Sequence, residues 1–156
     1  MWQPLWNGSC TTMTGVFATF PNIADTAGNV LSFALYADRG DLWPGALLKV
    51  LGDMPTTTTV ANTGRTQTVS APLTPNTVYW LAMMPKGGTL PTLRTNVNAH
   101  PLLGLPDTTF VRTTSPSQAY NYLYYTTPDG VYPATAGNET VLQLAQGMPR
   151  VAWIGT

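Results

Sequence analysis

The chain has 156 residues, the usual size of one domain with one hydrophobic core. Apolar residues supply 44% of it, whereas charged residues supply only 9%, and the formal net charge is zero. Without a charge excess, long apolar run or signal-type start, we expect no nucleic acid partner, no membrane association and no signal peptide.

The shortage of charged residues has two explanations. Neutral polar residues can cover the surface, as threonine does in the run from Thr56 to Thr59. Alternatively, surface that is buried against other subunits needs no charge, and interface cores are depleted in it. We therefore expect the chain to assemble. The only cysteine, Cys10, is expected to be a buried small apolar residue, since it has no partner for a disulfide or a zinc site.

Short apolar and β-branched runs separated by turn residues predict strands in the first half of the chain. The expected strands are Gly15 to Phe20, Val30 to Ala37, Ala46 to Leu51, Thr56 to Ala61, Arg65 to Ser70 and Thr77 to Met84. Asn62-Thr63-Gly64 has the composition of a tight turn, so the two strands that flank it are expected to form a hairpin. Thr77 to Met84 is apolar on both faces, which predicts a central strand.

The second half continues the same pattern with more prolines, which mark loops and strand edges. The expected strands are Thr92 to Val97, Thr108 to Arg112, Ala119 to Thr126, Thr140 to Gln146 and Arg150 to Ile154. Only Thr140 to Gln146 could be a short helix instead. About ten short strands without intervening helices predict a single all-β domain over residues 1–156, an antiparallel β-sandwich with a jelly-roll-like arrangement.

The titratable residues do not form a recognisable catalytic pattern. His100 is the only histidine and has no partner motif, and the aspartates are scattered singly among turns, where they cap backbone groups. We therefore expect no catalytic residue, no cofactor and no metal site. Asp38 and Asp41 could share a calcium ion, but a turn explains both of them better.

Three short motifs have a functional and a simpler explanation. Arg39-Gly40-Asp41 matches the integrin-binding tripeptide, but a turn between two strands accounts for it, with glycine chosen for its backbone freedom. Asn7-Gly8-Ser9 and Asn138-Glu139-Thr140 fit the glycosylation acceptor pattern, and we interpret both as chance matches.

Aromatic residues are the class that suggests binding. Tyr120, Tyr122 and Tyr124 alternate along one predicted strand, so their side chains share a face. Tyr132 follows this strand closely in the sequence, and Trp43 lies in the loop before Pro44-Gly45. Such residues can fill the core, form a subunit interface or stack on sugar rings, and these three interpretations stay open. Trp2 and Trp6 are likewise either anchors or core residues.

Four segments between residues 35 and 82 resemble a β-sandwich module of tailed-bacteriophage structural and fibre proteins. They are Leu35-Tyr36-Ala37-Asp38, Pro44-Gly45-Ala46-Leu47-Leu48, Ala71-Pro72-Leu73-Thr74-Pro75 and Tyr79-Trp80-Leu81-Ala82. Two departures are visible: the loop that carries Trp43 is longer, and Asn76 replaces the usual glycine, although asparagine also tolerates a positive φ. The resemblance implies that Tyr36 and Trp80 are core residues, and it implies no catalytic role.

The resemblance implies a non-enzymatic virion structural protein, such as a phage capsid decoration, cement or head-fibre protein. We expect a symmetric oligomer, with a trimer favoured, that is assembled in the host cytoplasm and located in the virion. Its partners would be its own copies and other virion proteins such as the major capsid protein. The alternative is a carbohydrate- or receptor-binding module of a tail fibre that uses surface aromatics on a host glycan.

Overall fold

The structure, a computed structural model, describes residues 2–20, 29–41, 43–57, 63–87, 95–96, 123–124, 130–136, 141–142, 148–149 and 151–156. These residues form strands and no helix. The strands are β1 (Trp2–Trp6), β2 (Thr12–Phe20), β3 (Val30–Asp38), β4 (Pro44–Pro55), β5 (Thr63–Pro72), β6 (Val78–Lys86), β7 (Thr95–Asn96), β8 (Leu123–Tyr124), β9 (Val141–Leu142), β10 (Met148–Pro149) and β11 (Val151–Gly155). Seven of these strands have five residues or more, and the other four have two.

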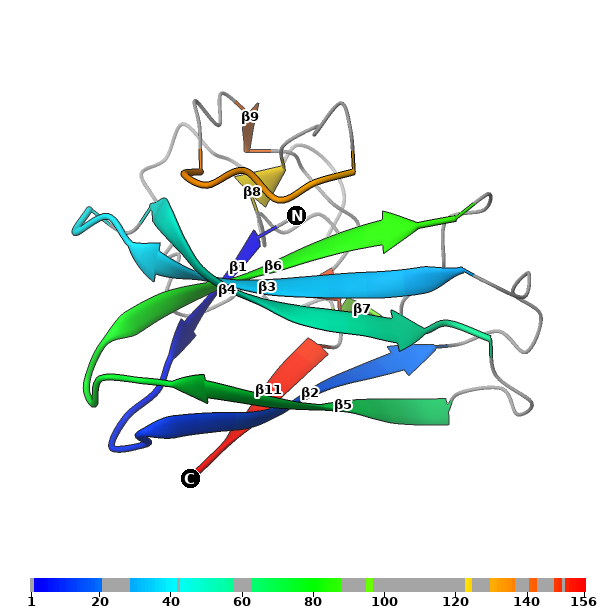
Figure 1. Cartoon of the computed structure of the whole chain (residues 1–156), viewed down its shortest axis with the longest axis horizontal. Helices are drawn as coiled ribbons and strands as arrows, with labels where there is room; N and C mark the ends of the chain where they lie inside the picture. The colour runs from blue at the N-terminus through cyan, green and yellow to red at the C-terminus, as the bar shows by residue number, and fades with distance from the viewer. Residues whose placement is uncertain are drawn as a thin grey trace.

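The long strands form two antiparallel sheets that face each other (Figure 1). Sheet A has the strand order β4-β3-β6-β1-β8-β9, and sheet B has the order β11-β2-β5. The short strands β10 and β7 pair separately. The antiparallel β-sandwich predicted from the sequence is thereby confirmed, whereas its closeness to a jelly roll stays a prediction.

The main hydrophobic core lies between the two sheets. Alternate residues of β3 and β6 point into it, among them the fully buried Phe33 and Met83, which are cross-strand partners. Sheet B supplies Met13, Val16 and Ala18 of β2 from the other side, all with no exposed surface. Because successive side chains of a strand point to opposite faces, the remaining residues of each strand form the two outer faces of the sandwich.

Strand β6 lies between β3 and β1, so the prediction of a central strand with two apolar faces is confirmed. Tyr79, Leu81 and Met83 belong to the core between the sheets, whereas Trp80 and Ala82 belong to a second cluster on the outer face of sheet A. The expectation that Tyr36 and Trp80 are core residues is also correct, since both are fully buried.

Asn7 joins two of the loops through which the chain crosses between the sheets, the one before β2 and the one before β6. Its Nδ2 donates to the carbonyls of Cys10 (2.8 Å) and Thr74 (2.7 Å), and its Oδ1 accepts from the amide of Thr77 (2.9 Å). The residue is 2% exposed. Nearby, Asn76 has a φ of 55°, the conformation for which the sequence already suggested a tolerant residue.

Three details differ from the sequence-based expectations. Strand β5 pairs with β2, and Thr63 and Gly64, expected in a turn, belong to that ladder. Thr56 and Thr57 lie outside the strands, so the predicted hairpin is wrong in its described part. Strand β1 was not predicted at all, although it lies inside sheet A.

Candidate functional site

The outer face of sheet A carries a cluster of aromatic and small residues, which we name the aromatic cluster. Tyr36 of β3 and Trp80 of β6 are paired across the strands and fully buried. The cluster consists of Ala34, Tyr36, Trp80, Ala82 and Ala136, with Trp43, Leu47 and Tyr132 packed against it. Two of the residues that the sequence marked as interface or sugar-stacking candidates, Trp43 and Tyr132, are therefore partly buried within the protein itself.

Residues 130–136, which we name the strap, cover this cluster and bind to β4. The amide of Leu47 donates to the carbonyl of Ala134, and the amide of Ala136 donates to the carbonyl of Gly45, both at 2.8 Å. The hydroxyl of Tyr36 donates to the carbonyl of Pro133 at 2.8 Å. Three hydrogen bonds thus fix the strap on the edge and outer face of sheet A.

Tyr132 of the strap contributes a ring contact and a buried hydroxyl. Its ring meets that of Tyr36 edge to face, with centroids 6.4 Å apart and an interplanar angle of 64°. Burial raises the pKa of Tyr132 well above its ordinary value, because the phenolate would lose its hydration. Its hydroxyl and that of Ser32 are both buried, and Ser32 and the backbone of Met84 are the polar groups that oppose this rise of the pKa.

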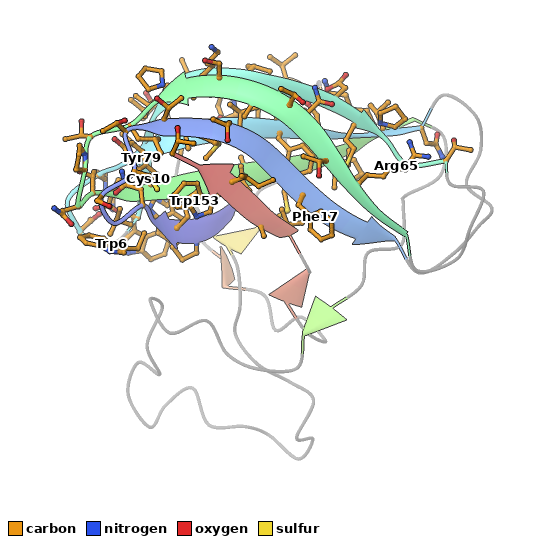
Figure 2. All side chains as sticks on the ribbon, turned by 90° about the horizontal axis from the view of Figure 1, so that it is seen from below. Trp6, Cys10, Phe17, Arg65, Tyr79 and Trp153 are labelled. Atoms are coloured by element: carbon orange, nitrogen blue, oxygen red, sulfur yellow. The ribbon has the colours of Figure 1, made fainter. Side chains whose placement is uncertain are left out.

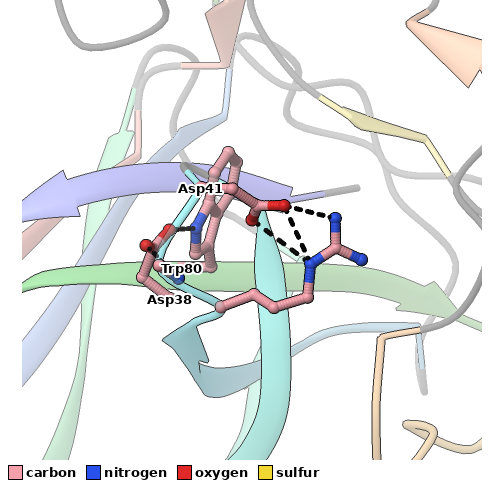
Figure 3. A network of polar contacts seen from close by, with 5 residues as sticks. Asp38, Asp41 and Trp80 are labelled. Atoms are coloured by element: carbon pink, nitrogen blue, oxygen red, sulfur yellow. Dashed lines mark hydrogen bonds and ion pairs between the residues drawn. The ribbon is translucent and has the colours of Figure 1, made fainter.

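The turn after β3 is organised by Asp38 (Figure 3). One carboxylate oxygen accepts from the indole Nε1 of Trp80, and the other accepts from the amide of Gly40, both at 2.8 Å. Gly40 has a φ of 99°, which favours glycine. The buried Trp80 therefore has its polar group satisfied, and the turn is held at the end of the sheet.

Arg39 and Asp41 form an exposed ion pair in this turn. Nη2 of Arg39 lies 2.7 Å from Oδ2 of Asp41, and Nε lies 3.2 and 3.1 Å from the two carboxylate oxygens. The hydrogen bond from Arg39 holds the pKa of Asp41 below its usual range. The turn interpretation of the tripeptide accounts for this geometry, and the carboxylates of Asp38 and Asp41 are each engaged by protein donors.

The outer face of sheet B has a different character. Seven charged residues are described, and only Arg65 belongs to sheet B. Arg65 pairs with the fully buried Ala18, so its side chain is on the inner face, where its guanidinium donates to the carbonyl of Thr57. Among the described residues, the outer face of this sheet carries no charge. We call it the neutral face, and Figure 2 looks onto this sheet.

Two glycines make the neutral face flat. A side chain on Gly64 would collide with the ring of Phe17, and one on Gly15 would lie 3.2 Å from the side chain of Ile154. The rings and methyl groups therefore lie across bare backbone instead of standing above it. The described residues of this face are Gly15, Phe17, Gly64, Thr66, Thr68, Ala152 and Ile154.

Large apolar side chains are exposed at two further places in the described part of the chain. Leu48 and Val50 of β4 and Val131 of the strap are 50%, 51% and 66% exposed, and we name them the aliphatic patch. Strand β4 has irregular register around these positions, which turns Leu48 outward. The second place is on β1, which β3 and β6 separate from β4 in sheet A, and there Trp6 is 48% exposed.

The structure describes only some of the other residues that the sequence marked as candidates. Tyr120, Tyr122 and His100 lie outside the described residues, and for Tyr124 only the backbone, in β8, is described. The sequence did not decide whether Trp6 is an anchor or a core residue. The alternation of Trp2, Pro4 and Trp6 is a strand-like signal that could have placed Trp6 on the face of Trp80. Cys10 is partly rather than fully buried and forms no disulfide with any described residue.

No group of three or more potential metal-ligating residues occurs among the described residues. In the same part of the chain, no helix has the length and apolar character needed to cross a membrane. Comparisons with protein-family models, with curated proteins and with solved structures found no match to this chain.

Proposed function

We propose that this chain is a non-enzymatic structural protein of a phage particle, a capsid decoration, cement or head-fibre protein that acts as a symmetric oligomer. The single observation that carries the proposal is the neutral face of sheet B. A sheet face left to solvent usually carries charged residues among its polar ones, whereas this one exposes threonine, alanine and isoleucine over two glycines.

The neutral face is suited to burial against another protein surface. No ionic group on its described residues has to be dehydrated when a partner binds, which removes the largest polar penalty of association. Threonine and isoleucine are stiff at χ1, so they lose little side-chain entropy on contact. The zero net charge of the chain means that copies do not repel one another as whole molecules.

The neutral face alone is small for a standard interface, which favours an interface that also uses a second, different surface of the protein. Three strands at a spacing of about 4.8 Å and about nine residues at about 3.4 Å each give a face of roughly 15 by 30 Å. This is about half of the roughly 800 Å² that one partner contributes to a standard interface. The aliphatic patch offers further apolar surface on the opposite sheet. An interface between unlike surfaces forms a ring when the rotation between copies closes, and a rotation of one third of a turn gives the trimer that we propose.

The virion setting rests on the sequence resemblance. Its segments lie together in the fold, because Tyr36 pairs with both Trp80 and Leu47, and Asp38 binds Trp80. The contacts among these residues are structural, which suits a module that presents its faces and loops to neighbours.

The test is the mass of the native protein, measured by native mass spectrometry and light scattering, for the natural chain, Thr68→Arg and Thr74→Arg. Thr68 lies on the neutral face, and Thr74 is an exposed threonine of the loop between β5 and β6, so it is the matched control. We expect an oligomer that Thr68→Arg dissociates and Thr74→Arg leaves intact.

The second measurement is sedimentation with phage heads that have been emptied and stripped of decoration proteins. We expect the natural chain and Thr74→Arg to sediment with the heads, and Thr68→Arg to remain in the supernatant. A natural chain that is monomeric at high concentration and does not sediment with any of the heads would overturn the proposal.

A further inference from the structure

Trp6 lies at an end of sheet A where a polar turn is also located. It pairs with Val78, and it follows the buried Pro4, the partner of Trp80, by two residues, so it shares the outer face with Trp80. Its side chain is 48% exposed, the largest exposed aromatic surface that the described residues offer (Figure 2).

The ladder between β3 and β6 brings the turn of Arg39 and Asp41 to the same end. Ala37 pairs with Tyr79, so the next position along β3, Asp38, faces Val78. Val78 is in turn the partner of Trp6. Asp38 and Trp6 therefore lie two strand spacings apart, about 10 Å between their backbones.

Hydrogen bonds to the rest of the protein hold the first residues of this turn. Asp38 is bound by the indole of the fully buried Trp80 and by the amide of Gly40, and the amide of Arg39 donates to the carbonyl of Trp43 at 2.8 Å. The exposed ion pair of Arg39 and Asp41 extends from this fixed turn into solvent. The exposed indole and the exposed ion pair thus lie at the same end of sheet A, which we name the rim.

We propose that this rim is a saccharide-binding site, with the indole of Trp6 stacked on the apolar face of a pyranose ring. Asp41 accepts hydrogen bonds from hydroxyl groups of the sugar, and the guanidinium of Arg39 donates to its hydroxyl or ring oxygens. The span between Trp6 and the turn suits a short oligosaccharide with its first ring on the indole.

The charges of the rim disfavour an anionic ligand and match a neutral saccharide better. Arg39 and Asp41 compensate each other, and the remaining carboxylate, Asp38, accepts from the Trp80 indole and the Gly40 amide, so the rim has no excess positive charge that would select a phosphate group. Hydroxyl groups both donate and accept, and a carboxylate beside a guanidinium offers them both complements. The site includes no residue of the neutral face or of the aliphatic patch, so it can be tested separately from the assembly proposed above.

The experiment uses a printed array of neutral hexose and hexosamine oligosaccharides, and then titration of the strongest ligand into the labelled protein. Binding is followed by nuclear magnetic resonance through the indole N–H signal of Trp6. We expect Trp6→Ala to weaken binding at least tenfold, Trp6→Phe to weaken it less, and Arg39→Ala to weaken it severalfold. Lys86→Ala, which removes the cation of an exposed ion pair at the opposite end of β6, is the control and should bind as the natural chain does.

Two results would overturn the proposal. One is an array on which the natural chain binds no better than Trp6→Ala. The other is a native mass that falls in Trp6→Ala while saccharide binding is unchanged, because Trp6 would then be a protein contact. Thermal unfolding of each variant is measured alongside, so that a loss of folding is not read as a loss of binding.

Discussion

The outer faces of the two sheets differ in which residues they carry and in whether the chain covers them. On sheet A, the chain places Tyr36 and Trp80 on the outside and then covers them with its own strap. On sheet B, the described residues leave the outer face uncovered, and it carries neither large buried aromatics nor charge. Among the described residues, the low charge of this chain is most evident on the outer face of sheet B, which no described segment covers.

The largest difference between the faces is expected from truncating one aromatic residue on each. Trp80→Ala should lower the free energy of unfolding by about 3–5 kcal/mol, because it removes a fully buried indole and one of the two hydrogen bonds to Asp38. Phe17→Ala on sheet B should lower it less, by about 1–2 kcal/mol, because Phe17 is only partly buried and packs on the backbone of Gly64. Urea denaturation measures both, and equal losses would contradict the comparison.

The next effect concerns Asn7, on which both faces depend because it joins the loops that connect the sheets. Asn7→Ala leaves two carbonyls and one amide without partners, so we expect a loss of about 3 kcal/mol in the free energy of unfolding. Asn76→Gly is the control in the adjoining loop. Its φ of 55° suits glycine, so the change should be within about 0.5 kcal/mol. A larger loss in the control than in Asn7→Ala would refute this role.

A smaller effect separates the two tyrosines under the strap. Tyr36→Phe removes the hydrogen bond to Pro133 and should cost about 1 kcal/mol. Tyr132→Phe removes a buried hydroxyl that faces Ser32 and the backbone of Met84 without a hydrogen bond of ordinary geometry, so it should cost less than Tyr36→Phe. Hydrogen exchange at the amides of Leu47 and Ala136, which bind the strap and β4 together, should speed up only in Tyr36→Phe. Faster exchange in both variants would count against this difference.

The smallest effect is a pH dependence that should occur on sheet A alone. The pKa of Tyr132 is raised in the folded state by burial, whereas in the unfolded chain it is about 10. The stability that this group contributes is therefore complete below about pH 10 and is lost as the pH rises above it. Between pH 9 and pH 11, the natural chain should lose more stability than Tyr132→Phe. Parallel curves would exclude this contribution.

The sequence predicted the strands whose apolar residues alternate without interruption. Val30 to Ala37 and Thr77 to Met84 are found in β3 and β6 with nearly the same bounds. Strand β1 was missed because it is short and contains Pro4, which normally argues against a central strand. At Pro4, β1 has β6 on one side but pairs with β8 only at Trp2, so the missing amide breaks no described ladder there.

The rest of the fold depended on interactions that local patterns do not encode. Strand β4 runs from Pro44 to Pro55, twice as long as the predicted Ala46 to Leu51, because register shifts interrupt its alternation. Strand β5 pairs with β2 rather than with the neighbouring segment, a choice between partners far apart in the sequence. The site residues Trp43 and Tyr132 are aromatic in the sequence, but only the strap determines that they pack inside.

The burial of Asn7 has a practical consequence for producing this protein. Asn7-Gly8-Ser9 is an acceptor sequence for N-linked glycans, and secretory pathways in eukaryotic cells attach them to chains that have not yet folded. A glycan on Nδ2 would replace one of the two hydrogens that bind Cys10 and Thr74. A secreted eukaryotic expression system would therefore yield a chain modified at the point where the two sheets are joined, and Asn7 would be the first position to inspect in a misfolded product.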